Sequence, residues 1–410
     1  MCSLNESIVN TIVTNTETPV ILKQFLKNNN LCKWSLDKWK SVFGEKMLPF
    51  RCLLKKRSVQ DPLWERTCEL KSMTFEQFID QIPNSEEWMY FDYKHINQWF
   101  DKDSDIFKEN LWKDFGFPDK VADSTLWIGN EGSHTPAHQD TYGFNIVAQL
   151  YGKKTWILYP PETHGFQPTR VPYEESSIYT NINFVSPTNL EVFKDLKGCR
   201  SVELDSGDAL IIPRGWWHFV RNTAPIAISM NIWLPHENDE ETRITEALTR
   251  IIVAQLCKDL PDDTTKQILN PNEDDLADTP LAILFMQLET VATKFLEIRK
   301  KSAKRLKTGQ DQDTSDKKDE DVDDLINKFK NNIEEVPLIT NKECINIIIN
   351  NKDKDSELPS EVSVPEKVEV DNKKYLLSKV LIDSFCDKNV IELVKQNFLD
   401  KFKRINDGSR

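Results

Sequence analysis

A histidine and an aspartate stand two residues apart in the sequence, at His138 and Asp140. Residues two apart on a β-strand point to the same face, so one imidazole and one carboxylate converge there. Such a pair supplies two of the three protein ligands in a two-histidine, one-carboxylate site, whose open coordination positions suit non-haem Fe(II). Alone, the His-x-Asp triplet is a weak signal, because it occurs by chance in many proteins.

The second histidine of such a site must come from another strand, and His218 in the segment GDALIIPRGWWHFV is the candidate. The segment reads as a strand, a Pro-Arg-Gly corner and the start of an aromatic strand. This corner would bring His218 to the mouth of a barrel, where His138 also lies. The alternative is a core histidine beside Trp216 and Trp217, and the residue taken by itself favours that alternative.

The elements that must position these residues are short apolar runs separated by turn signals, over residues 124–235. Gly152 and Gly207 mark two of the turns. Many short strands with such punctuation predict a β-barrel or sandwich. After His236 the apolar residues recur three and four apart, which predicts helices.

Composition and pattern divide the chain into six predicted parts. One of them is a linker, because its residues are almost all charged or polar and show no apolar period. The parts are a flexible tail (1–18), an α/β flank (19–90), the β domain (91–240), a helical region (241–298), the charged disordered linker (299–324) and a C-terminal helical region (325–410).

The bulk properties exclude several classes of protein. With a net charge of −13, the chain gains nothing from the release of counterions by phosphates, so we expect no general nucleic-acid binding. No apolar stretch approaches the ~20 residues that span a bilayer, so we expect no membrane segment. Eight cysteines without a C-x-x-C pair, and no basic start followed by an apolar run, predict a cytoplasmic protein, with nuclear entry left open.

Two segments carry a resemblance to a known family: LWIGNEGSHTPAHQDTYGFNIVAQLYGKKTWILYPP and GDALIIPRGWWHFV. They resemble the JmjC-domain hydroxylases, which are cupin-fold Fe(II)/2-oxoglutarate oxygenases, and they are similar to the factor-inhibiting-HIF type. The run PTRVPYEESSIY narrows the resemblance to a subgroup associated with a small heat-shock protein. The resemblance covers roughly residues 19–250. It implies a double-stranded β-helix with flanking helices, followed by an α-helical C-terminal region.

The resemblance also implies roles for individual residues. Lys154 matches the lysine that pairs with the distal carboxylate of 2-oxoglutarate, and Thr135 matches a threonine that hydrogen-bonds the same carboxylate. Asn145 and Asn231 match two asparagines near the carboxylate that binds iron. The positions that match the iron ligands are His138, Asp140 and His218.

The residue pattern supports some of these roles independently. An inward-pointing Lys154 needs an anionic partner, because a buried unpaired charge is very costly, and a dicarboxylate would supply one. The alternative is a turn lysine that faces solvent beside Lys153. In the last strand Ala227, Ser229 and Asn231 share one face, which leaves a lumen if that face points inward. The alternative is an ordinary amphipathic strand with one face in water.

Several functions stay open at this level. The resemblance implies a dioxygenase that uses Fe(II), 2-oxoglutarate and O₂ to hydroxylate a protein substrate, with demethylation as a less favoured outcome. A second hypothesis is a binding protein whose partner is a small heat-shock protein. A third is a hydroxylase of a tRNA base. The complete triad of His138, Asp140 and His218, together with Lys154, argues against a binding protein without catalytic activity. The acidic net charge argues against RNA as the substrate.

Overall fold

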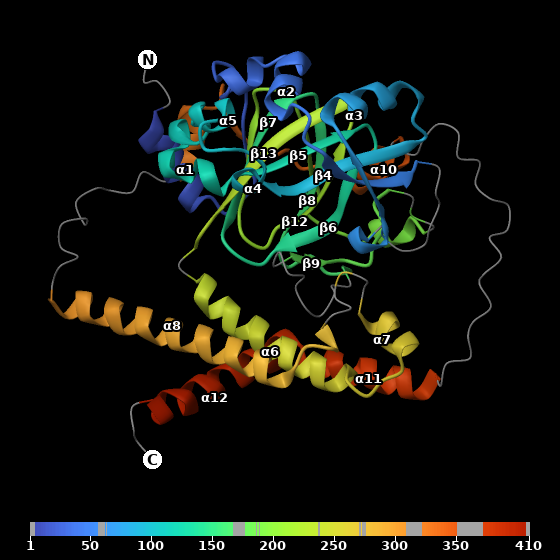
Figure 1. Cartoon of the computed structure of the whole chain (residues 1–410). Coiled ribbons are helices and arrows are strands. Elements are labelled where there is room, and N and C mark those ends of the chain that lie inside the picture. The colour runs from blue at the N-terminus through green and yellow to red at the C-terminus, as the bar shows by residue number, and fades with distance from the viewer. Residues whose placement is uncertain are drawn as a thin grey trace. The chain divides into compact units, whose positions relative to one another are not determined.

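In a computed structural model the chain forms two compact units, which we call the β unit and the helical unit (Figure 1). The β unit comprises residues 1–167, 179–235 and 320–358, and the helical unit comprises 168–178, 236–319 and 359–410. The residues that the structure describes are 5–55, 62, 64–166, 177–185, 187, 189–236, 238–269, 272, 276–308, 322–350 and 372–406.

Two antiparallel sheets form the β unit. The larger sheet has nine strands in the order β14-β1-β11-β7-β13-β5-β4-β2-β3, and the smaller has five in the order β10-β8-β12-β6-β9. The strands of the larger sheet, in chain order, are β1 (Val20–Leu22), β2 (Leu48–Leu54), β3 (Glu69–Met73), β4 (Glu87–His95), β5 (Thr125–Asn130), β7 (Phe144–Tyr151), β11 (Ala209–Ile212), β13 (Ile226–Leu234) and β14 (Ile333–Glu335). Those of the smaller sheet are β6 (His134–Asp140), β8 (Lys154–Tyr159), β9 (Ser177–Tyr179), β10 (Arg200–Leu204) and β12 (Trp217–Asn222). This is the expected β core with flanking helices.

Alternation along β13 separates two environments. Ile228, Met230 and Ile232 are fully buried in the main core, together with residues of the flanking helices. Ser229 and Asn231, on the opposite face, line a pocket. The inward lumen predicted from this strand is therefore confirmed, and the alternative of a face turned to water is wrong.

Most helices of the β unit pack on the main core and contribute aromatic residues to it, whereas Cys344 of the last one contacts Tyr159 of the smaller sheet. In the main core, Phe50 of β2 stacks on Phe78 with ring centroids 4.5 Å apart. A capping box between Thr74 and Gln77 fixes the start of the helix that carries Phe78. The helices of this unit are α1 (Glu6–Asn15), α2 (Leu36–Phe43), α3 (Phe75–Gln81), α4 (Ile96–Trp99), α5 (Asp105–Lys108), α9 (Val322–Lys328) and α10 (Asn341–Asn350).

Residues 6–15 differ from the flexible tail expected over 1–18, since they form helix α1. Val9, Ile12 and Val13 are three and four residues apart, and all three are buried in the main core. The side chain of Asn5 accepts a hydrogen bond from the backbone of Ile8 and caps the helix. Polar residues between these positions make the apolar stripe of the helix narrow, so the segment looks polar in the sequence. The helix is stabilised by packing of this stripe on the main core.

The C-terminal part also differs from the expected helical region over 325–410, because the described residues 322–350 belong to the β unit and include a strand. Strand β14 pairs antiparallel with β1, with Glu334 opposite Ile21. This pairing satisfies the backbone groups at the edge of β1, which no local sequence pattern encodes. Of the predicted linker, residues 299–308 continue a helix, and 309–321 lie outside the described residues.

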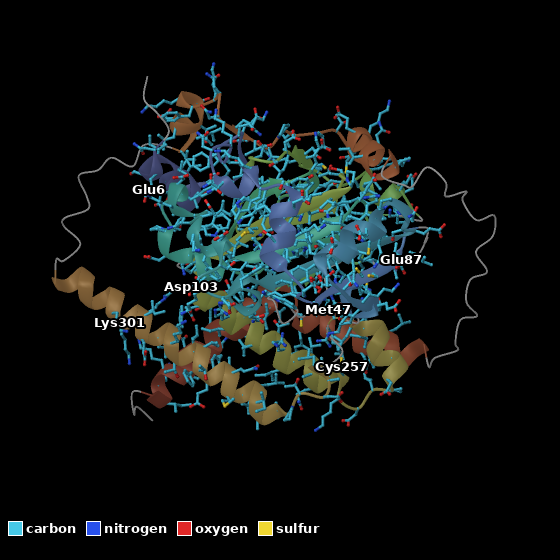
Figure 2. The ribbon with its side chains drawn as sticks, turned by 45° about the horizontal axis from the view of Figure 1, so that its top comes forward. Glu6, Met47, Glu87, Asp103, Cys257 and Lys301 are labelled. Atoms are coloured by element: carbon cyan, nitrogen blue, oxygen red, sulfur yellow. The ribbon has the colours of Figure 1, made fainter. Side chains whose placement is uncertain are left out.

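The helical unit packs around two clusters of buried apolar side chains. Cys257, labelled in Figure 2, lies in one of them. A buried Lys395 ammonium group pairs with Glu241 at 2.9 Å and ties two of the helices together. No helix among the described residues is long and apolar enough to cross a membrane. The helices are α6 (Asp239–Cys257), α7 (Asp262–Ile268), α8 (Leu281–Thr308), α11 (Asn372–Phe385) and α12 (Lys388–Asn406).

Candidate metal centre

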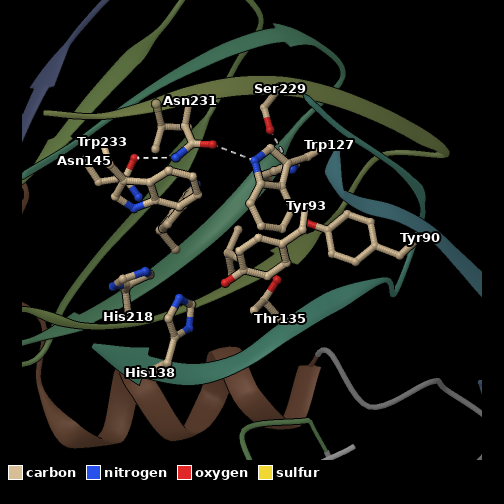
Figure 3. A pocket seen from close by; sticks show the side chains of 14 residues that line it. Tyr90, Tyr93, Trp127, Thr135, His138, Asn145, His218, Ser229, Asn231 and Trp233 are labelled. Carbon is tan, nitrogen blue, oxygen red and sulfur yellow. Dashed lines mark hydrogen bonds between the residues drawn. The ribbon is translucent and has the colours of Figure 1, made fainter. Parts of the chain in front are cut away.

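His138, Asp140 and His218 meet at one point of the smaller sheet. Strands β6 and β12 pair antiparallel with His218 directly opposite His138, and the two imidazole rings are 4.1 Å apart between centroids (Figure 3). The Nε2 atom of His138 is 3.7 Å from Oδ1 of Asp140, and that of His218 is 3.9 Å from Oδ2. One potential ligand atom from each residue lies within 4.8 Å of the other two, so a single metal ion fits between them.

The backbone orients both imidazole rings. Nδ1 of His138 is 2.9 Å from the carbonyl oxygen of Pro136, and Nδ1 of His218 is 2.9 Å from that of Trp216. A ring that donates its Nδ1 proton to a carbonyl presents the lone pair of Nε2 to the metal. Burial, assisted by the neighbouring His218, lowers the pKa of His138 well below its usual range. The neutral imidazole that binds metals is therefore the favoured form.

A chain of hydrogen bonds from the larger sheet holds the carboxylate of Asp140. Its Oδ2 atom accepts from the amide of Asn145 at 3.1 Å and from the indole of Trp233 at 2.9 Å. Asn231 donates to Oδ1 of Asn145 at 2.8 Å, and Trp127 donates to Oδ1 of Asn231 at 2.7 Å. The two asparagines named from the family resemblance thus lie in one network with Asp140, while Trp127 and Trp233 were not predicted.

Replacing Asn145 by alanine is expected to weaken metal binding by about 10- to 100-fold, because groups that orient a metal ligand typically contribute this much. The substitution removes a donor to Asp140 and leaves Oδ1 of that carboxylate, and both histidines, in place. Titration of the metal-free protein with Mn²⁺ measures the effect. The matched control is Asn341→Ala, which removes an exposed amide that donates to the backbone of Lys194. Equal loss of affinity in both variants would contradict the proposed role of the network.

A bulge in β6 turns Thr135 into the same pocket as His138. In a regular strand, residues three apart face opposite sides. Here His138 pairs with His218 and Thr135 pairs with Val220, so two residues of β6 oppose one residue of β12. Pro136, which cannot donate a ladder hydrogen bond, lies in this bulge. The buried Thr135 hydroxyl has no hydrogen-bond partner of good geometry among the described residues.

Lys154 points inward and is almost fully buried, with 1% of its surface exposed. Its ammonium group donates to the hydroxyl of Ser229 at 2.7 Å and lies 5.5 Å from the centre of the Tyr90 ring. No carboxylate within the described part of the chain forms an ion pair with it. Burial lowers the pKa of Lys154 to about 7, although Asp92 opposes this shift. The alternative of a solvent-facing lysine is wrong, and Lys153 beside it is the one that faces solvent.

The stability of the metal-free protein is expected to rise with pH because of Lys154. The unfolded chain keeps this proton up to about pH 10, whereas the folded chain releases it near pH 7. Between these values the unfolded state binds more protons, so the free energy of unfolding increases with pH by at most ~1.4 kcal/mol per pH unit. The measurement is denaturant unfolding of the wild type and Lys154→Met from pH 6.5 to 9. Lys154→Met should be more stable than the wild type at pH 6.5, and this difference in the free energy of unfolding should shrink as the pH rises. Parallel pH profiles of the two proteins would contradict the lowered pKa of Lys154.

These side chains line one pocket, whose empty volume, counted together with space open to solvent, is about 370 Å³. The triad histidines, Thr135 and Lys154 all contribute to its wall. Most of the remaining lining is aromatic. Alternation within β8 and β13 is the signal that would have identified Trp156 and Trp233, whereas a bulge brings Tyr93 of β4 into the pocket. Lining residues absent from the sequence-based assignment are Tyr90, Tyr93, Trp127, Val147, Trp156, Val220, Ser229 and Trp233.

The donor groups fit a metal ion and an anionic co-substrate. Two imidazoles and one carboxylate are the ligand set of non-haem Fe(II), and Asp140 has no cationic partner other than histidine in the described residues. Lys154 and the buried hydroxyl of Thr135 offer a cation and a hydrogen-bond donor to a carboxylate in the same pocket. Both parts of the pocket therefore carry polar groups that a ligand would satisfy.

Comparison with known proteins indicates the family to which the chain belongs. The Cupin-like domain family matches residues 7–240, which is more than half of the chain. HSPB1-associated protein 1 of Bos taurus is 39% identical over 257 residues, covering 58% of this chain and 53% of that protein. The Homo sapiens protein of the same name is 35% identical over 303 residues, covering 70% and 61%.

A more distant relative carries the name of an enzyme. Lysine-specific demethylase JMJ30 of Arabidopsis thaliana is 26% identical over 234 residues, covering 55% of this chain and 52% of that protein. The chain thus spans between about half and three fifths of the length of these relatives. The match over residues 7–240 and the assembled triad lead to one conclusion: the chain belongs to the family of cupin-like JmjC domains.

Proposed function

We propose that this protein is an Fe(II)- and 2-oxoglutarate-dependent dioxygenase that hydroxylates a side chain of a protein substrate. The observation that carries the proposal is that one pocket holds both the histidines of the triad and Lys154, a buried ammonium group without a carboxylate partner in the described chain. Such a lysine is costly to bury. A binding protein without catalytic function has no use for it, whereas a dicarboxylate co-substrate would neutralise it.

In this proposal each polar residue of the pocket has a separate task. His138, Asp140 and His218 hold the iron, and Asn145 with Trp233 fixes the orientation of the carboxylate. Lys154 and Thr135 bind the distal carboxylate of 2-oxoglutarate. When bound, the iron and the co-substrate together activate O₂, so that one oxygen atom enters a C–H bond of the substrate and 2-oxoglutarate becomes succinate and CO₂.

The rest of the pocket supports this chemistry by excluding water. Its aromatic side chains give the ammonium group of Lys154 a low-dielectric surrounding, in which its attraction to a carboxylate is stronger than in water. Ser229 holds the ammonium group in position before the co-substrate arrives. Such preorganisation limits the entropy that binding costs.

A second candidate function is that of a binding protein for a small heat-shock protein. It is favoured by the names of the relatives that are 35–39% identical to this chain. Demethylation is the other alternative within the oxygenase class, because hydroxylation of an N-methyl group releases that group. The name of the plant relative supports it. Hydroxylation of a protein side chain stays our proposal, and demethylation differs from it only in the group that is hydroxylated.

The test is an anaerobic titration of the full chain with Fe(II) and 2-oxoglutarate, followed by an assay for succinate after O₂ is admitted. We expect one iron and one 2-oxoglutarate per chain, and slow succinate formation even without a substrate. Protein that binds neither ligand, or that binds both and forms no succinate with any candidate protein, would favour the binding-protein function. We place the proposed enzyme in the cytoplasm, since the seven cysteines of the described chain are free.

A further inference from the structure

One residue of the pocket has a backbone conformation that its side chain disfavours. Tyr93 has a φ of +52°, in the left-handed region that bulky residues rarely adopt. It lies in a bulge of β4, where Asp92 and Tyr93 together oppose the single residue Trp127 of β5. Strain of this kind persists where the surrounding structure enforces it, and it concentrates at functional sites.

A buried ion pair holds this bulge in place. The guanidinium group of Arg51 bonds to the carboxylate of Asp92, and both residues are more than nine-tenths buried. Arg51 also lies opposite Tyr90 in the pairing of β2 with β4. Breaking a buried ion pair is strongly destabilising, so the pair fixes Asp92 and, through the backbone, the strained Tyr93 that follows it.

The consequence of the bulge is that Tyr90 and Tyr93, three residues apart, both face the pocket. The Tyr93 ring contacts that of Trp127 at 4.5 Å and is nearly parallel to that of Trp233, with centroids 6.3 Å apart. In Figure 3 its phenol is directed toward the side of the pocket where the triad histidines lie. Without the bulge, Tyr93 would face away from the site.

These three rings form the rim of the pocket. Tyr93, Trp127 and Trp233 are partly exposed, whereas Tyr90 and Trp156 are buried deeper. The indole N–H groups of both rim tryptophans are already used within the network that holds Asp140. What the tryptophans can offer a substrate is therefore the faces of their rings. Ring faces bind other planar groups, including a guanidinium group, by offset stacking.

We propose that Tyr93 is a specificity-determining residue, which selects a substrate with a planar side chain and places that side chain beside the metal centre. The proposal rests on the proposed function, since it assigns the substrate class of the same site. Arg51 and Asp92 are positioning residues in this arrangement, because they hold the bulge that carries Tyr93. Aromatic rings, imidazole and guanidinium are the planar groups in question, and a flexible aliphatic side chain gains less from such a rim.

The first test uses the full chain loaded with Mn²⁺ and 2-oxoglutarate, which binds without turnover. The probe is an array of synthetic peptides that differ at one position, where each natural side chain and the methylated lysines stand in turn. We expect wild-type protein to retain peptides with planar side chains about tenfold more strongly than those with aliphatic ones. Tyr93→Phe should keep this preference, and Tyr93→Gly should reduce it to about twofold at the same occupancy of metal and co-substrate.

The second test separates substrate recognition from packing. Glycine adopts a positive φ without strain, whereas alanine does not. The thermal midpoint of Tyr93→Gly should therefore exceed that of Tyr93→Ala by about 2–4 °C, although both lack the ring. Asn110→Gly, at another residue with positive φ and outside the pocket lining, controls for the effect of glycine itself. It should leave the peptide preference unchanged.

The outcomes distinguish this inference from the proposed function. Protein that binds neither Mn²⁺ nor 2-oxoglutarate would overturn the proposed function, and the inference with it. Protein that binds both but shows no preference for planar side chains, or a Tyr93→Gly variant with the preference of the wild type, would overturn the inference alone. A midpoint of Tyr93→Gly below that of Tyr93→Ala would show that the residue is held by packing rather than against strain.

Discussion

Replacing His138 or His218 by alanine is expected to abolish stoichiometric binding of a divalent metal ion. Each substitution removes one of the three candidate ligands, and no other His, Cys, Asp or Glu of the described chain is grouped with the two that remain. A missing ligand changes both the geometry and the number of open coordination positions. Metal analysis after reconstitution with Fe(II) or Mn²⁺ under anaerobic conditions measures the loss. The control is His164→Ala, which changes an exposed histidine outside the pocket.

A substitution at Asp140 distinguishes the proposed enzyme from a binding protein without catalytic activity. Asp140→Asn preserves the size of the side chain and keeps an oxygen that can accept from Trp233, but it removes the charge that balances the metal. We expect succinate formation to vanish while the fold, and any association with a small heat-shock protein, stay intact. An Asp140→Asn variant with normal metal content and normal succinate formation would contradict the assignment of Asp140 as a metal ligand.

Lys154→Met is expected to weaken binding of 2-oxoglutarate while leaving metal binding nearly intact, because the lysine and the metal ligands are separate groups. A hydrogen bond to a charged group is worth about 1.5–3 kcal/mol, which corresponds to roughly 10- to 100-fold in affinity. Methionine matches the length of the lysine stem and brings no charge. The same variant should be more stable than the wild type near pH 7 when no ligand is bound, since a desolvated ammonium group is removed.

The neighbouring residue gives the matched control for this experiment. Lys153 is about half exposed and pairs with Glu203 and Asp205 at 3.1 and 2.8 Å. Lys153→Met removes the same charge one position away, so its affinity for 2-oxoglutarate should stay within about twofold of the wild type, as surface ion pairs contribute little. Isothermal titration of the Mn²⁺-loaded protein measures both variants. Equal affinity in wild type and Lys154→Met would mean that the co-substrate binds elsewhere or not at all.

The sequence by itself predicted the short strands of residues 124–235 and two of the candidate metal ligands. His138 and Asp140 are two residues apart on one strand, and a period of two places both side chains on one face whatever the rest of the fold does. The same rule separated the apolar face of β13 from Ser229 and Asn231. These features are local, so they could be predicted without knowing which strands are neighbours.

His218 and Lys154 could be assigned from the sequence only through the resemblance to a family. Taken alone, Lys154 favoured a solvent-facing side chain, which is wrong. Taken alone, His218 favoured a core histidine, whereas the structure groups it with His138 and Asp140. The pairing of β12 with both β6 and β8 decides the matter, since it brings His218 opposite His138 and Asn222 opposite Lys154. Which strands pair is a property of the whole chain, because residues 58 or more apart in the sequence must meet.

The tertiary structure alone decided the features that break the local period. The bulges in β6 and β4 bring Thr135 and Tyr93 into the pocket against the alternation of their strands. A bulge arises from the register of two partner strands and is stabilised by distant groups such as Arg51, so no window of sequence around it reports it. The return of β14 to the edge of β1 has the same cause. Its hydrogen bonds depend on which backbone groups the rest of the fold leaves unpaired.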